Sequence, residues 1–211
     1  MRISTVIKAL LAATAVAPML AHAESSTATG AGALNVTAHV DFQITIPKFV
    51  FLRIGTGTGT LAGGYANNAT VDQITWAPTP ATVGTGVMAG TGGDLLNGTE
   101  TAAVYANGNG NVTLSCTTTG ALNDGAGDNI SYATITTTAS VLSSVTALPV
   151  CVLADGATNN VVIPAVAKVV SRDAKWAYTY SNATIPPAGT YGGGGAGNTG
   201  AGRVTYTAAI P

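Results

Sequence analysis

The chain has 211 residues, among them 27 glycines, and only 8% of its residues are charged, against about a quarter in typical soluble domains. Two of its eight basic residues lie in the first 23 positions, so the rest of the chain has a net charge of about −3 and no basic patch to bind phosphates. This balance argues against nucleic acid as a partner. Good helix formers are scarce and no later stretch has a 3.6-residue period, so we expect an all-β domain with one hydrophobic core.

Residues 1–23 have the pattern of a cleaved secretory signal peptide. Arg2 and Lys8 form a basic n-region before an apolar h-region at Ala9–Val16. Ala21-His22-Ala23 is an A-x-A cleavage signal. The apolar run is too short to span a bilayer, and no later run reaches 18 apolar residues, so no transmembrane segment is expected. We expect export through the inner membrane and one mature domain, a β-sandwich over residues 24–211.

Within residues 33–46, the side chains alternate between apolar and polar without a break from Leu34 to Ile46. Because strand side chains point to opposite faces with period two, the pattern predicts one long strand, with residues 24–32 as a flexible leader. Pro47 ends the strand, since proline cannot donate to a ladder. Its apolar face is formed by Leu34, Val36, Ala38, Val40, Phe42, Ile44 and Ile46. Two roles are open: the first strand of its own sandwich, or a segment added to a neighbouring molecule.

The rest of the chain predicts short strands separated by turns, as in a β-sandwich. Asn107-Gly108-Asn109-Gly110 predicts a tight hairpin turn, because Asn-Gly tolerates positive φ. A β-branched run at 161–170 predicts a central strand. The predicted strands, in order, are 49–54, 71–76, 101–106, 111–118, 130–139, 141–152, 161–170, one through Trp176, Tyr178 and Tyr180, and 203–210.

Cys116 and Cys151 are the only cysteines. In an exported chain an even pair usually forms a disulfide, and we expect one here. Two buried free thiols are the weaker alternative in an oxidising compartment.

No catalytic or cofactor site is predicted. His39, the single histidine after residue 23, lies on the polar face of the long strand beside Asp41, so a solvated strand histidine is expected rather than a catalytic base. Residues 195–200 match G-x-G-x-x-G but lack the flanking strand and helix of a dinucleotide site. Asn123–Asn129 could offer oxygens to Ca²⁺ but has no distal bidentate Glu, and it is predicted as an ordinary turn. No metal site is predicted.

Trp176, Tyr178 and Tyr180 alternate on one face of a predicted strand. Such aromatic residues usually belong to a core. They could instead stack on a sugar, and this keeps open a second function, a secreted monomeric sandwich that binds a glycan as an adhesin.

Both ends of the chain resemble bacterial fimbrial subunits. The opening strand LNVTAHVDFQITIP resembles the donor strand of alternate-class chaperone–usher pilins. The turn PPAGTY (Pro186–Tyr191) and the last strand RVTYTAAI resemble the C-terminal part of spore-coat-U-like and chaperone–usher pilin domains.

The resemblance implies an immunoglobulin-like sandwich completed by strand exchange between subunits. It implies a non-enzymatic subunit of a cell-surface or extracellular filament, with identical subunits as partners. A periplasmic chaperone and an outer-membrane usher would assist assembly. The apolar face of residues 33–46 would make the contact between subunits.

Overall fold

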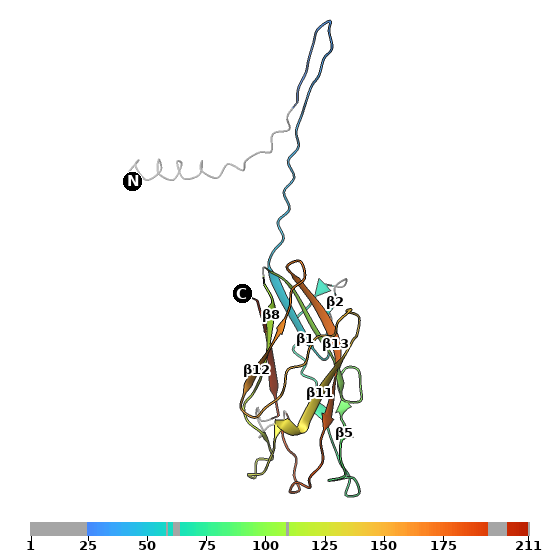
Figure 1. The fold of residues 1–211 in the computed structure, drawn as a ribbon, viewed down its shortest axis with the longest axis vertical. Helices are drawn as coiled ribbons and strands as arrows, with labels where there is room; N and C mark the ends of the chain where they lie inside the picture. The colour runs from blue at the N-terminus through green and yellow to red at the C-terminus, as the bar shows by residue number, and fades with distance from the viewer. Residues whose placement is uncertain (1–24, 58, 61–63, 109, 194–201, 211) are drawn as a thin grey trace, which may run out of the picture. The chain divides into compact units, whose positions relative to one another are not determined.

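The structure is a computed structural model that describes residues 25–57, 59–60, 64–108, 110–193 and 202–210 (Figure 1). The predicted signal peptide and the G-x-G-x-x-G match at 195–200 lie outside these residues. The chain divides into two units, Met1–Ile46 and Pro47–Pro211. No helix in the described ranges is long and apolar enough to cross a membrane.

Residues 33–46 do not form the predicted strand. The described part of the first unit has a bend at residues 30–32 and otherwise no regular secondary structure. A strand needs a hydrogen-bonded neighbour, and the alternating pattern alone does not provide one. The long strand is therefore absent from the single chain.

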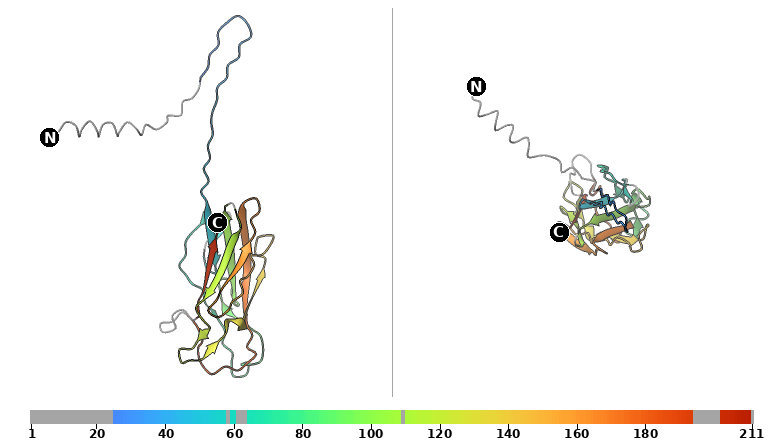
Figure 2. Two further views of the ribbon diagram at one scale, coloured as in Figure 1. Left: turned by 60° about the vertical axis from the view of Figure 1, so that its left-hand side comes forward. Right: turned by 90° about the horizontal axis from the view of Figure 1, so that it is seen from above.

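The second unit contains two main antiparallel sheets. The first has the order β1 (Phe49–Ile54), β7 (Thr99–Asn107), β13 (Val169–Tyr180) and β11 (Ile135–Ser140), and β5 (Met88–Ala89) adds to the end of β13. The second has the order β12 (Thr158–Ile163), β8 (Val112–Thr118) and β14 (Val204–Ala209). The two sheets face each other as layers of a sandwich (Figure 2).

Three two-stranded pairs and one short 3-10 turn complete the fold. The pairs are β2 (Gly59–Thr60) with β3 (Gly64–Tyr65), β4 (Ile74–Thr75) with β6 (Thr91–Gly92), and β9 (Leu122–Asn123) with β10 (Asn129–Ile130). The 3-10 turn spans Tyr132–Thr134.

The core lies between the two sheets. Alternate residues of β7 and β13 meet those of β8 and β12, and Trp176 is the largest side chain in the centre. Its indole Nε1 donates to the Leu148 carbonyl at 3.0 Å, which satisfies the polar atom of a ring that is 1% exposed. The fully buried members of this core include Ala102, Val104, Val112, Leu114, Leu148, Ile163 and Ala174.

The predicted all-β class is confirmed. The order β1-β7-β13-β11 matches the A-B-E-D sheet of an immunoglobulin-like domain. However, the chain forms β12 between β11 and β13, and β12 pairs with β8 in the other sheet. In the immunoglobulin fold strand E follows strand D directly, so the immunoglobulin-like topology stays a prediction.

Several predicted elements are confirmed and others are wrong. Strands form close to the predicted positions at β1, β7, β8, β13 and β14. The Asn107–Gly110 turn does not join paired strands, because β7 and β8 belong to different sheets. Residues 141–152 contain no strand. The strand predicted at 161–170 is broken, since β12 ends before Pro164 and both Ala167 and Lys168 have positive φ. β12 is an edge strand rather than a central one.

Candidate functional site

The apolar face of residues 33–46 is exposed. Phe42 is 91% exposed and Ile44 is 86% exposed. Leu34, Val36, Val40 and Ile46 are exposed as well. Extended apolar patches are unusual on soluble proteins and often belong to interaction sites, so this face is a candidate site.

Strands β1 and β14 each have one unpaired edge. β14 pairs with β8 from Val204↔Thr118 to Ala209↔Thr113, and β1 pairs with β7. Within the described residues no strand pairs with the other edge of either. Such edges present a row of backbone N–H and C=O groups that can accept another strand.

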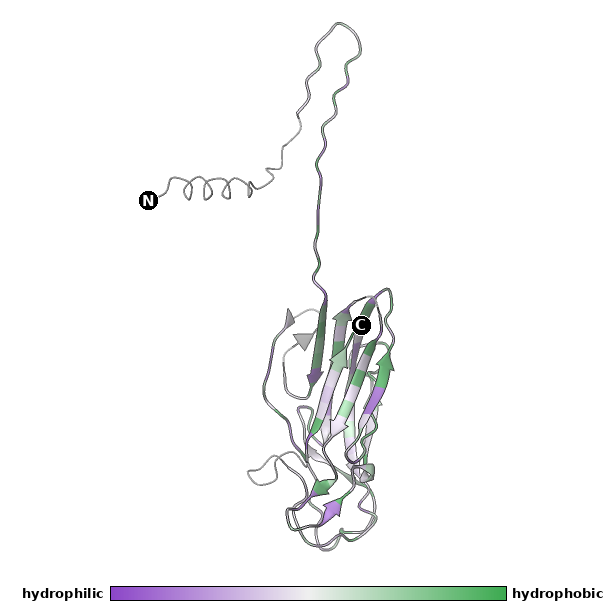
Figure 3. Cartoon of the chain, turned by 90° about the vertical axis from the view of Figure 1, so that its left-hand side faces the viewer, coloured by the Kyte–Doolittle hydropathy of each residue, from purple (hydrophilic) through white to green (hydrophobic). Residues whose placement is uncertain are grey.

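The two unpaired edges are neighbours. β1 and β14 lie side by side, one from each sheet, without a ladder between them in the described part of the chain (Figure 2). We call this boundary the open seam, formed by β1 (Phe49–Ile54) and β14 (Val204–Ala209). β1, with the sequence FVFLRI, is apolar over most of its length (Figure 3).

The inward-facing side chains of the open seam are incompletely covered. On β1 the register places Val50, Leu52 and Ile54 opposite core residues of β7, yet Val50 is 43% exposed. On β14, Val204, Tyr206 and Ala208 are only half-buried. In contrast, the inward-facing residues of the central strand β8 are 0–4% exposed. The sandwich is therefore closed at its centre and open along the seam.

One end of β1 is held by the side chain of Asn107. The backbone N–H of Phe49 donates to Asn107 Oδ1 at 2.6 Å, and Asn107 Nδ2 donates to the Pro47 carbonyl at 2.8 Å. These two bonds bracket Lys48 and fix the point at which the chain enters the sandwich. A Cβ at Gly108 would lie 3.1 Å from Ile210 and 3.5 Å from Lys48, so β1 begins at the end of the sandwich where β14 finishes.

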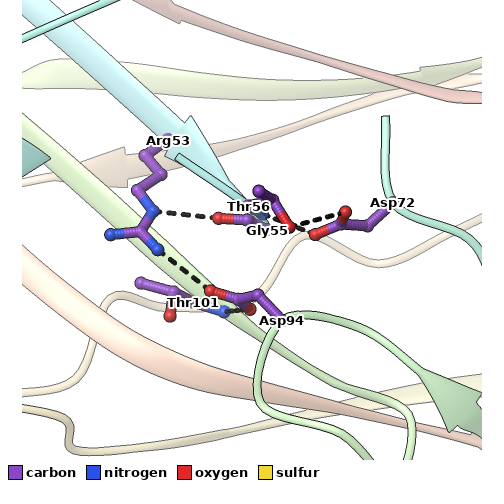
Figure 4. Close-up of polar contacts among 6 residues, drawn as sticks. All are labelled: Arg53, Gly55, Thr56, Asp72, Asp94 and Thr101. Atoms are coloured by element: carbon purple, nitrogen blue, oxygen red, sulfur yellow. Dashed lines mark hydrogen bonds and ion pairs between the residues drawn. The ribbon is translucent and has the colours of Figure 1, made fainter. Parts of the chain in front are cut away.

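The other end of β1 carries an ion pair. Arg53 Nη2 lies 2.9 Å from Asp94 Oδ2, and Arg53 Nε donates to the Gly55 carbonyl at 2.9 Å (Figure 4). The second oxygen of Asp94 accepts the backbone N–H of Thr101 at 2.7 Å. Asp94 thus connects β1 to the start of β7.

A second carboxylate closes the same turn. Asp72 accepts from the backbone N–H of Thr56 and, at 2.8 Å, from its hydroxyl (Figure 4). Gly55 has φ +75°, and a Cβ there would lie 2.3 Å from Asp72 Oδ2. Only glycine fits this close approach without strain.

Glu100 is a buried acid beside this turn. It is 6% exposed, and its register with Trp176 places it on the inward face of β7. Burial, together with the negative charges of Asp72 and Asp94, raises the pKa of Glu100 to about 7.

Tyr178 of β13 and Tyr206 of β14 lie on the inward side of the same region. Their hydroxyls are 3.3 Å apart. Burial raises the pKa of Tyr206 to about 12 and that of Tyr178 well above its usual value, so both are neutral at physiological pH. The negative charge of Glu100 also contributes to both upward shifts of the pKa.

The predicted disulfide is present. Cys116 and Cys151 are bonded, with their Cα atoms 6.1 Å apart. The bridge ties β8 to the segment before β12 and lies in a small second core with Tyr132 and Leu153.

The aromatic face considered for glycan binding is not accessible. Trp176, Tyr178 and Tyr180 alternate on one face of β13, as predicted, but they are 1%, 7% and 9% exposed. That face packs into the core, so the hypothesis of a sugar site on it is wrong.

The Asn123–Asn129 loop has the contacts of a turn. Asp124 Oδ1 accepts backbone N–H groups from Ala126, Gly127 and Asp128 at 2.8–3.0 Å. These bonds, that from Ala126 foremost, lower the pKa of Asp124. Neither this loop nor exposed His39 belongs to a group of three or more potential metal ligands, and the described ranges contain no such group.

The apolar face of residues 33–46 was predicted from the sequence, whereas the open seam and the carboxylates beside it were not. Arg53 and Asp94 are 41 positions apart, and β1 and β14 are separated by most of the domain. No local sequence pattern predicts contacts between residues or strands so far apart in the chain. The one available signal was an inward-facing Glu100 in the apolar alternation of β7.

No family model, no curated protein and no solved structure matches the chain.

Proposed function

We propose that the protein is a non-enzymatic structural subunit of an extracellular filament. Residues 33–46 of one subunit, the donor segment, add as a strand to the open seam of the next. The observation that carries this proposal is the complementarity between an exposed, alternating apolar segment and a sandwich with two adjacent unpaired edges. The resemblance to fimbrial subunits described above supports it.

Strand addition suits both surfaces. The added strand supplies main-chain hydrogen bonds to the edge, while its alternate side chains cover the half-buried residues beneath. β14 has 6 residues, and the donor segment is about twice as long. Burying five of its large side chains at about 1.5–3 kcal/mol each gives about 8–15 kcal/mol before the entropy of ordering is subtracted.

The positions of the ends of β1 and β14 determine in which direction the donor segment is expected to run along β14. The donor segment precedes β1, which begins at the end of the sandwich where β14 finishes. In a stack of subunits with one orientation, the segment enters its neighbour at the opposite end, where β14 starts. Leu34 then lies toward Ala209 and Ile46 toward Val204, antiparallel to β14.

Addition to a neighbour is favoured over insertion into the same chain. To pair beside its own β1, the donor segment would have to reverse at Pro47-Lys48. The Asn107 side chain bonds the backbone on both sides of Lys48 and opposes that reversal. Head-to-tail addition does not close on itself, so it produces a fibre.

A pair of substitutions on the donor segment tests the proposal. In the mature chain, Val40→Asp with Phe42→Asp places two charges on the apolar face. We expect a folded monomer that forms no fibres by electron microscopy and that binds an added peptide of residues 33–46.

The matched control is Thr37→Asp with Gln43→Asp, which adds the same charges to the polar face and should leave fibre formation intact. If the Val40/Phe42 variant does not fold even with the peptide present, the segment belongs to its own core and strand donation is refuted. Fibres formed by that variant would refute it as well.

A further inference from the structure

Glu100 lies on the inward face of β7, close to the end of the open seam at which β1 finishes and β14 starts. It lies on β7 next to Ala102, which pairs with Ile54, the last residue of β1. On the other side it pairs with Trp176 of β13, whose ring centroid lies 5.6 Å from that of Tyr206, the middle inward-facing residue of β14. Glu100 is therefore bounded by both strands of the open seam.

The groups around Glu100 do not neutralise it. Asp72 and Asp94 face it with like charge from the loops before β4 and β7. The guanidinium of Arg53 in β1 is bonded to Asp94 (Figure 4). Tyr178 of β13 and Tyr206 of β14 are neutral, and their hydroxyls lie within hydrogen-bond distance of each other. Within the described residues the Glu100 carboxyl accepts no hydrogen bond.

We propose that addition of the donor segment is coupled to the uptake of one proton by Glu100. This inference rests on the proposed function. In the antiparallel arrangement, Ile44 and Ile46 of the donor cover the part of the seam between Ile54 and Tyr206. They bring apolar surface and no cation, so they remove water from a carboxyl that has no other compensation. The charged form of Glu100 is disfavoured in such surroundings, and the neutral form is accepted.

The affinity of the open seam for the donor segment is expected to fall as the pH rises above 7. In the unoccupied subunit the pKa of Glu100 is about 7, and covering the seam raises it further. Below pH 7 the carboxyl is already neutral and the affinity for the donor segment is constant. Above pH 7 a proton must be taken up on binding, so the affinity falls by up to tenfold per pH unit. Filament growth is thus favoured in mildly acidic surroundings and weakened in alkaline ones.

The test measures binding of a labelled peptide of residues 33–46 to the mature Val40→Asp/Phe42→Asp chain by fluorescence anisotropy at pH 5.5, 7.0 and 8.5. The peptide carries His39→Gln, so that it contains no imidazole. We expect the dissociation constant to be flat up to pH 7 and to rise by up to about 30-fold at pH 8.5. Glu100→Gln should abolish this rise, whereas Asp128→Asn, in an exposed loop, should retain it.

A second measurement follows the carboxyl itself. After residue 23 the chain has only two glutamates, Glu24 and Glu100, so ¹³C labelling of glutamate resolves Glu100 by NMR. Its midpoint should lie near 7 in the unoccupied chain and rise on saturation with the peptide. Affinity independent of pH, a pH dependence that survives Glu100→Gln, or an unchanged midpoint would overturn the coupling and leave strand donation standing. A peptide that binds at no pH would refute both.

Discussion

The disulfide lies on the strand that holds the accepting edge, and its removal has a predictable cost. Cys116 is in the middle of β8, where it is opposite Tyr206 of β14 on one side and Asn159 of β12 on the other. The sequence separation of 35 between the cysteines gives a loop-closure contribution of about 4 kcal/mol in the chain-entropy model. Cys116 and Cys151 are 2% and 4% exposed, so small apolar replacements fill the site without leaving a buried thiol unpaired.

We therefore expect Cys116→Ala with Cys151→Ala to lower the free energy of unfolding by about 3–4 kcal/mol. The measurement is urea unfolding of the monomeric Val40→Asp/Phe42→Asp chain with and without the cysteine changes. Unfolding the unchanged chain in reductant should give the same lower midpoint. A loss below about 1 kcal/mol would refute the loop-closure reasoning, because the cross-link would then not constrain the unfolded chain.

Two further predictions concern side chains that bond to the backbone of loops and strand ends in the sandwich. Asp173 accepts the backbone N–H groups of Ser143 and Ser144 at 2.9 and 2.7 Å, and although burial raises its pKa, these bonds and those from the serine hydroxyls outweigh burial and hold the pKa below its usual value. The stabilisation that Asp173 provides is present above the unfolded pKa near 3.8 and is lost as the pH falls through the lower folded value. In thermal unfolding, Asp173→Asn should therefore cost about 2 kcal/mol at pH 7 and little near pH 2. An equal cost at both pH values would contradict the assignment of these bonds to the ionised carboxylate. Asn107→Ala removes both bonds that bracket Lys48 and should cost about 1–2 kcal/mol, with faster amide exchange at Phe49; unchanged exchange there would show that the side chain does not fix the start of β1.

The sequence predicted the fold class because its signals are local. Alternation along 204–209 and the β-branched and apolar residues of 49–54 identify strands wherever their partners lie. The same reasoning failed at 161–170, where Pro164 and the left-handed Ala167 and Lys168 divide an apolar run into an edge strand and a turn. It also failed at Asn107–Gly110, because turn chemistry does not reveal whether the next strand stays in the same sheet.

Of the two parts of the candidate site, the sequence predicted the apolar segment but not the edge that accepts it. The apolar face of residues 33–46 follows from a period of two, but a long alternating stretch predicts a strand and does not show whether it pairs within its own chain or with a neighbour. The accepting edge depends on which strands β1 and β14 leave unpaired, and that is a property of the complete topology. The environment of Glu100 likewise depends on Asp72 and Asp94 reaching it from two separate loops.

In the proposed filament, β14 of one subunit pairs with residues 33–46 of another. Cryo-electron microscopy of fibres assembled from the mature chain tests it most directly. We expect density for an added strand along the outer edge of Val204–Ala209, antiparallel to β14 and continuous with Phe49 of the neighbouring subunit. Fibres in which that edge stays unpaired, or in which the added strand connects to Phe49 of the same subunit, would contradict it.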